Sequence, residues 1–247
     1  MTPPTPPAEQ QHGDGSFATT RWSLISGVRA LTPEAARAID ELCRIYWYPL
    51  YCYIRRRGYG PDDAQDLVQG YFEELLEKNL FSKADRTKGK LRAFLLSTLK
   101  HYLADEVKRA QAAKRGGGIE FVPIDTTDAE ARYFQEPVDL ESPDRLYDRR
   151  WALLILEKAV AALGDKWRLM GKGEIFAAMT PYLREPLTAV DSERIGSELA
   201  ISKSNVEVSL HRLRTGFRES LRAEIAQTVN SEAEIKEELA ALRAAVR

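Results

Sequence analysis

The chain has 247 residues, 44% of them apolar and 30% charged, and its formal net charge is −1. This balance excludes a disordered chain and indicates a charge-rich globular protein, for which two domains fit the length better than one. The net charge excludes a uniformly basic coat for nucleic acid, although an average can hide separate basic and acidic segments. No apolar run approaches the roughly 20 residues that cross a bilayer, and the first residues lack a secretion signal. We therefore expect a cytoplasmic protein without a membrane contact.

Two cysteines, Cys43 and Cys52, lie in an aromatic stretch with helical spacing. No CxxC pair and no cluster of histidines accompanies them. The pattern predicts buried, reduced thiols, and we expect neither a bound metal nor a cofactor.

Three helices are expected in the first half of the chain. After a tail rich in Pro, Gln and Gly over residues 1–16, which we expect to be disordered, apolar residues recur at helical spacing from Pro33 to Arg57. Pro49 is expected to bend or break this first helix. A second helix is expected to open at Asp62, and a third to run from Lys90 to Ala113.

The third predicted helix lies in a strongly basic stretch. Residues 83–115 hold ten Lys and Arg side chains against three acidic ones, with aromatic residues among them. Surfaces that hold single-stranded nucleic acid combine charge with stacking in this way. The candidate residues are Phe94, Lys100, His101, Lys108 and Arg109. The alternative for Phe94 is a place in the core, since it falls near the apolar stripe of the helix.

The next stretch has the opposite charge. Residues 119–148 hold nine acidic side chains against two arginines, and three prolines interrupt them. This composition predicts an acidic linker over residues 117–148.

Helical periodicity returns at Arg149. A short helix capped by Asp191, a turn at Ala200 and a longer helix capped by Ser202 predict a helix-turn-helix. The residues on the longer helix that could reach bases and phosphates are Lys203, Ser204, Asn205, Glu207, His211 and Arg212. An ordinary helical hairpin with a solvated face is the alternative.

No strand-like alternation of useful length is present, so the predicted fold class is all-α. We expect two helical domains, over residues 17–116 and 149–230, joined by the acidic linker. The second would contain the helix-turn-helix. An amphipathic helix over residues 231–247 would follow, either packed on the second domain or bound to a partner.

The second predicted helix has an acidic face that can dock on a basic partner helix, or simply be solvated. Its sequence, DAQDLVQGYFEELLEK, resembles the polymerase-binding segment of bacterial extracytoplasmic-function sigma factors. Asp66, Leu67, Gln69 and Phe72 fall on the family's D-L-x-Q-x-x-F pattern.

Two further segments resemble the same family, in the family's order. LRAFLLSTLKHYLADEVKRAQAAKR is similar to its promoter-melting segment, and SERIGSELAISKSNVEVSLHRLRTGFRESL to its C-terminal helix-turn-helix. The chain departs from the family at Phe94, His101 and Lys108, where Trp, Asn and Arg are usual. Residues 167–189 are also additional length before the helix-turn-helix.

The resemblance implies a non-enzymatic transcription initiation factor, with core RNA polymerase and promoter DNA as partners and an anti-sigma factor left open as a third. The polymerase would be bound through Asp66, Gln69, Phe72 and Glu73. The basic helix would hold the melted strand, and the helix-turn-helix would enter a major groove, with Arg214 or Arg218 adding phosphate contacts. The acidic linker could thread a basic channel of the polymerase.

Three alternatives remain at this point. A helix-turn-helix regulator that acts without polymerase explains the second half only. A hydrolase using His101 and Asp105, one helical turn apart, lacks a nucleophile motif, metal spacing and a phosphate loop. A helical interaction protein with a degenerate sigma fold would bind polymerase without supporting transcription.

Overall fold

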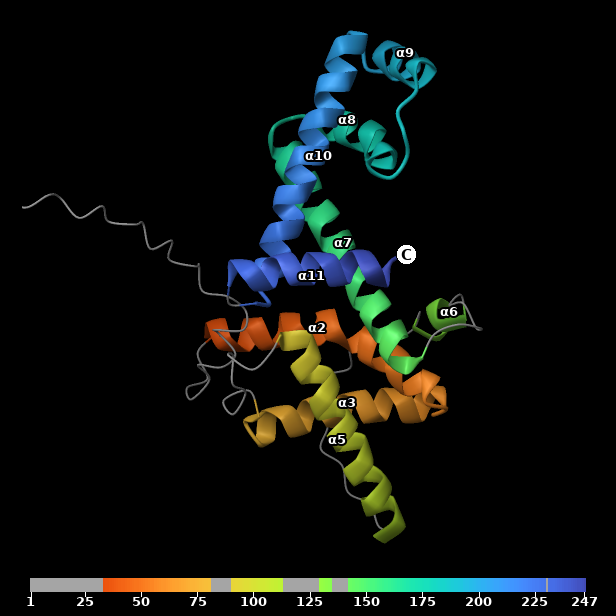
Figure 1. Ribbon diagram of the computed structural model, residues 1–247, viewed down its shortest axis with the longest axis vertical. Helices are drawn as coiled ribbons and strands as arrows, with labels where there is room; N and C mark the ends of the chain where they lie inside the picture. The colour runs from red at the N-terminus through yellow and green to blue at the C-terminus, as the bar shows by residue number, and fades with distance from the viewer. Residues whose placement is uncertain (1–32, 81–89, 113–128, 135–141, 230) are drawn as a thin grey trace, which may run out of the picture.

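The computed structural model describes residues 33–80, 90–112, 129–134, 142–229 and 231–247 (Figure 1). Every regular element in these ranges is helical, so the all-α fold class is confirmed for the described part of the chain. The expected tail over residues 1–16 and most of the expected acidic linker lie outside these ranges. Among the described helices, none combines the length and apolar character needed to cross a membrane.

The described elements are α-helices and one 3-10 turn. They are α2 (Pro33–Arg56), α3 (Pro61–Glu77), α5 (Leu91–Ala112), α6 (Ala129–Phe134), α7 (Pro143–Leu169), α8 (Gly173–Met179), a 3-10 turn (Thr180–Leu183), α9 (Ala189–Glu198), α10 (Lys203–Ala226) and α11 (Glu232–Ala245).

Pro49 was expected to bend or break this helix, and because α2 is continuous through Pro49 the break is excluded. Proline removes one backbone hydrogen bond, but packing of the surrounding side chains can outweigh that loss. Every residue from Ile45 to Ile54 is buried, so α2 is the centre of the first hydrophobic cluster.

The first cluster is built from α2, α3, α5 and the first half of α7, with the end of α10 and α11 added. Helices α3 and α5 approach closely at Gly70. A β-carbon there would lie 2.5 Å from the hydroxyl oxygen of Tyr102, so any other residue would require the end of the Tyr102 side chain to shift.

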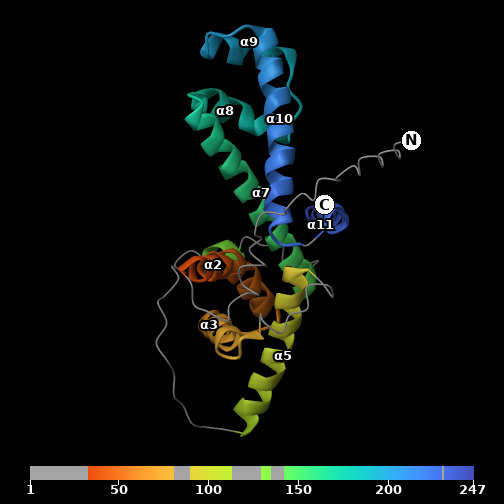
Figure 2. The same cartoon turned by 90° about the vertical axis from the view of Figure 1, so that its left-hand side faces the viewer.

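The second cluster joins the end of α7 to α8, α9 and the first half of α10. Its buried members are Leu163, Trp167, Met179, Tyr182, Ile195, Val206, Leu210 and Leu213. Helices α7 and α10 lie side by side and pass from one cluster to the other (Figures 1 and 2). The two halves of the molecule are therefore connected by two long helices.

The helix start expected at Arg149 is wrong, because α7 begins earlier, at Pro143. The Ser142 hydroxyl accepts the backbone N–H of Arg145 at 3.3 Å, and a proline in the first helical position suits a helix start. Leu146 and Tyr147, assigned to the linker, are fully buried. Because this first turn is rich in acidic residues and begins with a proline, its two apolar positions were interpreted as part of the linker.

The additional segment over residues 167–189 is a packed part of the second cluster. Arg214 Nη2 donates to the carbonyl oxygens of Tyr182 at 2.9 Å and Glu185 at 3.4 Å. Arg214, which with Arg218 was one of two alternatives for a DNA phosphate contact, here joins this segment to α10.

Candidate nucleic-acid interface

Helix α9 begins with a reciprocal cap formed by Thr188 and Asp191. The Thr188 hydroxyl accepts the backbone N–H of Asp191, and the Asp191 carboxylate accepts the backbone N–H of Thr188, both at 3.1 Å. The capping residue is thus Thr188, and the expectation that Asp191 caps the helix is corrected. A capping box needs an acceptor three residues into the helix, and Asp191 fills that place.

A tight turn joins α9 to α10. Ala200 has a φ of 51°, and the backbone N–H of Ile201 donates to the carbonyl oxygen of Gly196 at 2.9 Å. This is the left-handed ending typical of helix C-termini. The Ser202 hydroxyl then accepts the N–H of Asn205 at 3.2 Å and starts α10, as predicted.

Gly196→Ala is expected to destabilise this turn by about 1–2 kcal/mol, as overpacking does in a closed site. A β-carbon on Gly196 would meet the Ile201 carbonyl oxygen at 2.8 Å, and backbone cannot rotate away as a side chain can. Thermal unfolding of Gly196→Ala against the exposed neighbouring change Ser197→Ala measures the effect. Equal melting temperatures for the two variants would contradict this account.

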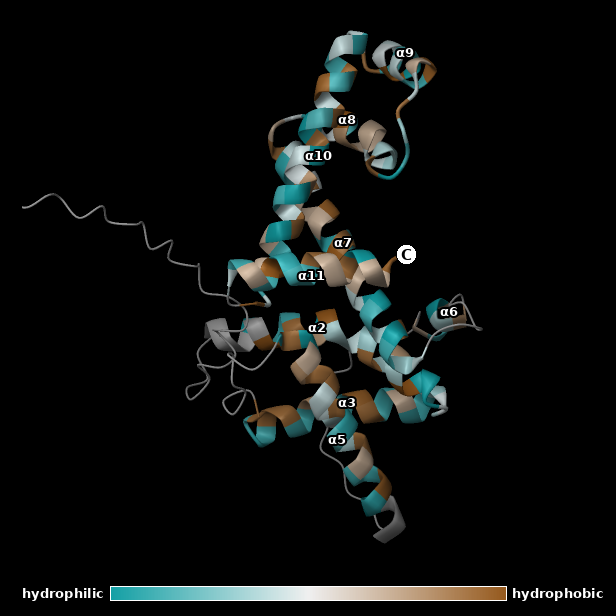
Figure 3. Ribbon diagram, viewed as in Figure 1, coloured by the Kyte–Doolittle hydropathy of each residue, from teal (hydrophilic) through white to brown (hydrophobic). Residues whose placement is uncertain are grey.

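The candidate residues of α10 are all exposed but divide between two faces. At three- and four-residue spacing, Ser204, Glu207 and His211 share one stripe. Asn205 and Arg212 lie on an adjacent stripe. Hydrophilic and hydrophobic residues alternate along α10 (Figure 3).

Lys203, at the start of α10, lies 3.6 Å from a Glu193 carboxylate oxygen of α9, and both side chains are largely exposed. Such a surface pair contributes little and leaves the ammonium available to another anion.

The candidate residues of α5 contact other residues of the same chain. Lys100 pairs with Asp144, Lys108 with Asp105 at 3.1 Å, and Arg109 with Glu74 at 3.0 Å and with Glu106. His101 Nδ1 lies 2.7 Å from the carbonyl oxygen of Ser97. Phe94 is half-buried and packs against the first cluster. The first four side chains remain on the exposed side of the helix.

The candidate polymerase-binding residues of α3 differ in exposure. Asp66 is exposed, and Gln69 Nε2 donates to Glu73 Oε1 at 3.3 Å on the same surface. Phe72 is only 3% exposed and packs beside Tyr71 in the core. The expectation that Phe72 makes a contact with a partner is therefore corrected: it anchors the helix that presents the other three.

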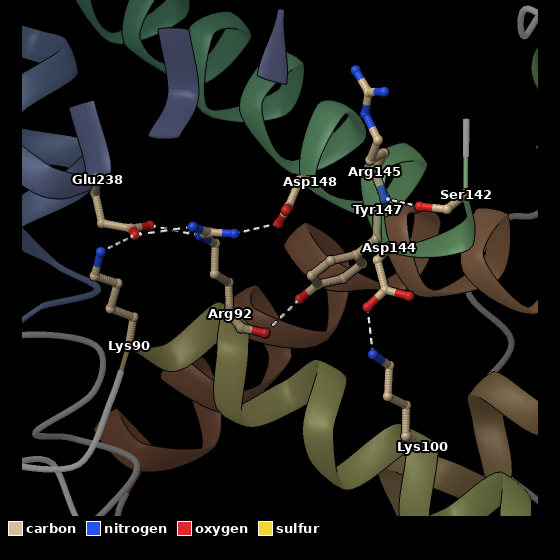
Figure 4. Close-up of polar contacts among 9 residues, drawn as sticks. All are labelled: Lys90, Arg92, Lys100, Ser142, Asp144, Arg145, Tyr147, Asp148 and Glu238. Carbon is tan, nitrogen blue, oxygen red and sulfur yellow. Dashed lines mark hydrogen bonds and ion pairs between the residues drawn. The ribbon is translucent and has the colours of Figure 1, made fainter. Parts of the chain in front are cut away.

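An ion cluster centred on the buried Glu238, not expected from the sequence, joins α5 to α7 and α11 (Figure 4). Arg92 donates to both carboxylate oxygens of Glu238, at 2.8 and 3.2 Å, and pairs with Asp148. Lys90 lies 2.9 Å from Glu238, which is 1% exposed. The Arg92 guanidinium also lies 4.8 Å from the ring centre of Trp151.

Within the ion cluster, the opposite charges offset the cost of burying one another. Burial opposes the charge of Arg92, yet its hydrogen bonds to Glu238 raise its pKa overall. Burial raises the pKa of Asp148, and Arg92 opposes that rise. A carboxylate as buried as Glu238 requires such partners, since an unpaired buried charge is strongly disfavoured. Helix α11, which was expected to pack on the second domain or to bind a partner, is thus also tied to α5 in the first half of the chain.

The described acidic residues of the predicted linker are engaged within the chain. Helix α6 docks on α2 through Glu130, which accepts hydrogen bonds from Tyr51 and from Arg55 Nε at 3.0 Å. Tyr133 adds an edge-on contact with Tyr51, with ring centres 6.3 Å apart. Asp144 and Asp148 pair with α5, as described above. In this arrangement these carboxylates cover basic side chains of the protein itself.

The Glu130 contact predicts an acid-sensitive docking of α6. The hydrogen bond from Arg55 holds the pKa of Glu130 below its ordinary value of 4.5, so its contribution to stability is present above that value and is lost as the pH falls through the lowered pKa. The melting-temperature difference between the unmodified chain and Glu130→Gln is expected to be largest near about pH 7 and to shrink below about pH 4. A difference that is the same at both pH values would contradict the docking.

The hydrolase alternative would pair Asp105 with His101. The Nδ1 of His101 faces Ser97 and Asp105 pairs with Lys108, so the two side chains are engaged elsewhere. Within the described residues, no group of three His, Cys, Asp or Glu side chains is placed to hold a metal. Cys43 and Cys52 are free and buried, as predicted, and burial raises their pKa values to about 12 and about 11.

Comparison of the chain with protein-family models, with curated proteins and with solved structures gave no match.

Proposed function

We propose that the chain is a transcription initiation factor of the extracytoplasmic-function sigma type, which binds core RNA polymerase and directs it to promoter DNA. The observation that carries the proposal is the α9–turn–α10 unit. Its turn is fixed by Gly196 and Ala200, and the start of its second helix is exposed and polar. We assign this unit as a helix-turn-helix in the second of two domains.

The α3 surface supports the polymerase contact. Asp66, Gln69 and Glu73 lie on one side of α3, while Phe72 and Val68 fix the opposite side in the core. A rigid helix that presents carboxylates and an amide suits a basic partner helix. The three surface residues match the family pattern or lie beside it.

The ion pairs of α5 fit a role in holding a melted strand. The Lys100–Asp144 pair is about half exposed on both sides, with side-chain exposures of 43% and 48%. An exposed pair is worth at most about 1 kcal/mol, so a DNA phosphate can replace Asp144 at little cost. A DNA phosphate cannot replace the buried Glu238 in the same way, so the Arg92–Glu238 pair would remain. Strand capture would therefore use Lys100, His101, Lys108 and Arg109.

Co-purification with core RNA polymerase tests the first half of the proposal. The chain is expected to bind core polymerase with Asp66 intact and to lose most of that binding in Asp66→Ala. Asp62→Ala, an exposed carboxylate at the start of the same helix, is the matched control. No binding by the unmodified chain would remove the sigma assignment.

A second candidate, a helix-turn-helix regulator that acts without polymerase, is favoured by one observation. The basic side chains of α5 are paired with carboxylates, whereas Glu207 and His211 of α10 are exposed and form no ion pair within the described residues. This candidate predicts DNA binding without polymerase binding, so the same experiment separates the two.

A further inference from the structure

A pocket of about 330 Å³ lies between α7, α8 and α10, in the part of the chain that includes the additional segment. Its lining residues are Leu163, Lys166, Trp167, Met170, Lys172, Ile175, Ser209, Arg212, Gly216 and Glu219. This volume lies at the lower end of the range for small-molecule sites, roughly 300–1,000 Å³.

Two helical stripes form facing walls of the pocket. The α7 wall repeats at three- and four-residue steps and is mainly apolar, with the buried Trp167 at its centre. The middle of the α10 wall is formed by Gly216, which has no side chain to fill the pocket. A β-carbon at Gly216 would lie 2.8 Å from Leu163 Cδ1, so glycine also allows the two helices to approach.

The polar side chains of the pocket have one predominant charge. Lys166, Lys172 and Arg212 line it together with a single carboxylate, that of Glu219. Within the part of the chain that the structure describes, none of these three cations forms an ion pair, and all three are exposed. Cations that gather without carboxylate partners around an apolar wall favour an anion with an apolar body.

We propose that this pocket binds a small amphipathic anion. The carboxylate or equivalent group lies among Lys166, Lys172 and Arg212, and the apolar body lies against Trp167, Leu163 and Ile175. The volume admits a single short apolar chain or ring system and excludes a two-chain lipid. The additional segment thereby acquires a role, since it supplies Lys172 and Ile175 and completes the wall begun by α7.

Arg212 connects this site to the candidate DNA surface. The bound anion neutralises Arg212 and so weakens the attraction of α10 for DNA phosphate. Ligand binding itself does not depend on the proposed function, whereas this regulatory effect does.

Calorimetric titration of the full chain with decanoate, below its micelle concentration, tests the site. Decanoate is expected to bind, and acetate, which lacks the apolar body, is expected to bind at least about tenfold more weakly. Lys166→Gln and Lys172→Gln are each expected to weaken decanoate binding about tenfold, as the loss of a charge-assisted contact does. Arg168→Gln is the matched control, because Arg168 is an exposed cation of α7 that pairs with Asp165 and lies outside the pocket lining.

Equal binding of acetate and decanoate would overturn the proposal, as would decanoate binding that neither lysine change weakens more than the control does. A DNA mobility-shift assay with saturating decanoate tests the regulation. If decanoate binds but leaves DNA affinity unchanged, the regulatory role of Arg212 is overturned while the site stands. If the chain binds no DNA at all, the failure belongs to the proposed function.

Discussion

Arg92→Ala is expected to lower the free energy of unfolding by about 3 kcal/mol, the cost of leaving a buried carboxylate without its main partner. Glu238 is 1% exposed and receives two hydrogen bonds from Arg92. Lys90 remains within 2.9 Å, which keeps the expected loss near the lower end of the range for buried pairs. Chemical denaturation of the full chain measures the difference.

The matched control is Arg109→Ala, which removes an arginine of the same helix whose side chain is 52% exposed. Its expected cost is below about 1 kcal/mol. The paired change Arg92→Met with Glu238→Leu is expected to recover at least about half of the loss, because no buried charge is then left unpaired. Equal costs for Arg92→Ala and Arg109→Ala would show that the ion cluster does not tie α5 to α11.

Asp66→Ala and Arg212→Ala are expected to have opposite effects on the two proposed partners. Arg212→Ala should weaken upstream DNA binding about tenfold and leave polymerase affinity unchanged, since a phosphate or base contact is worth roughly 1–3 kcal/mol. Asp66→Ala should weaken polymerase binding by a similar factor and leave DNA binding unchanged. Mobility shifts with promoter DNA and titrations with core polymerase provide the two readouts.

The two residues are suitable because both are exposed and lie in different clusters, Asp66 on α3 beside the first and Arg212 on α10 beside the second. Neither change opens a core cavity, so a loss of binding in either variant cannot be attributed to unfolding. If both changes impair both partners equally, the division of labour between α3 and α10 is wrong.

The helices and caps were predictable where the signal is local. Ser202 caps α10 as its spacing from Asn205 indicates, α3 begins within a residue of the expected position, and α5 begins and ends within a residue of its expected bounds. The continuity of α2 through Pro49 was not predictable, because it depends on packing from other helices. The start of α7 was missed for a related reason: the adjacent pair Leu146 and Tyr147 is flanked on both sides by charged residues, and only the folded chain shows that both are buried.

The candidate site was predictable in its residues but not in their pairing. The exposed positions of α10 follow from helical spacing alone. That Asp144 covers Lys100, or that Glu238 meets Arg92 across 146 positions of sequence, depends on the tertiary arrangement of α5, α7 and α11. The burial of Phe72 was open to prediction, since its position belongs to the apolar stripe of α3 as well as to the family motif.

Run-off transcription with purified core RNA polymerase tests the central claim most directly. On genomic DNA fragments selected by binding to the chain, core polymerase with the unmodified protein is expected to start transcripts at defined positions. Core polymerase alone, or with Asp66→Ala, is expected to give little or none. Selected fragments that the chain binds but from which no transcript starts, with polymerase shown to be active by another initiation factor, would contradict the account.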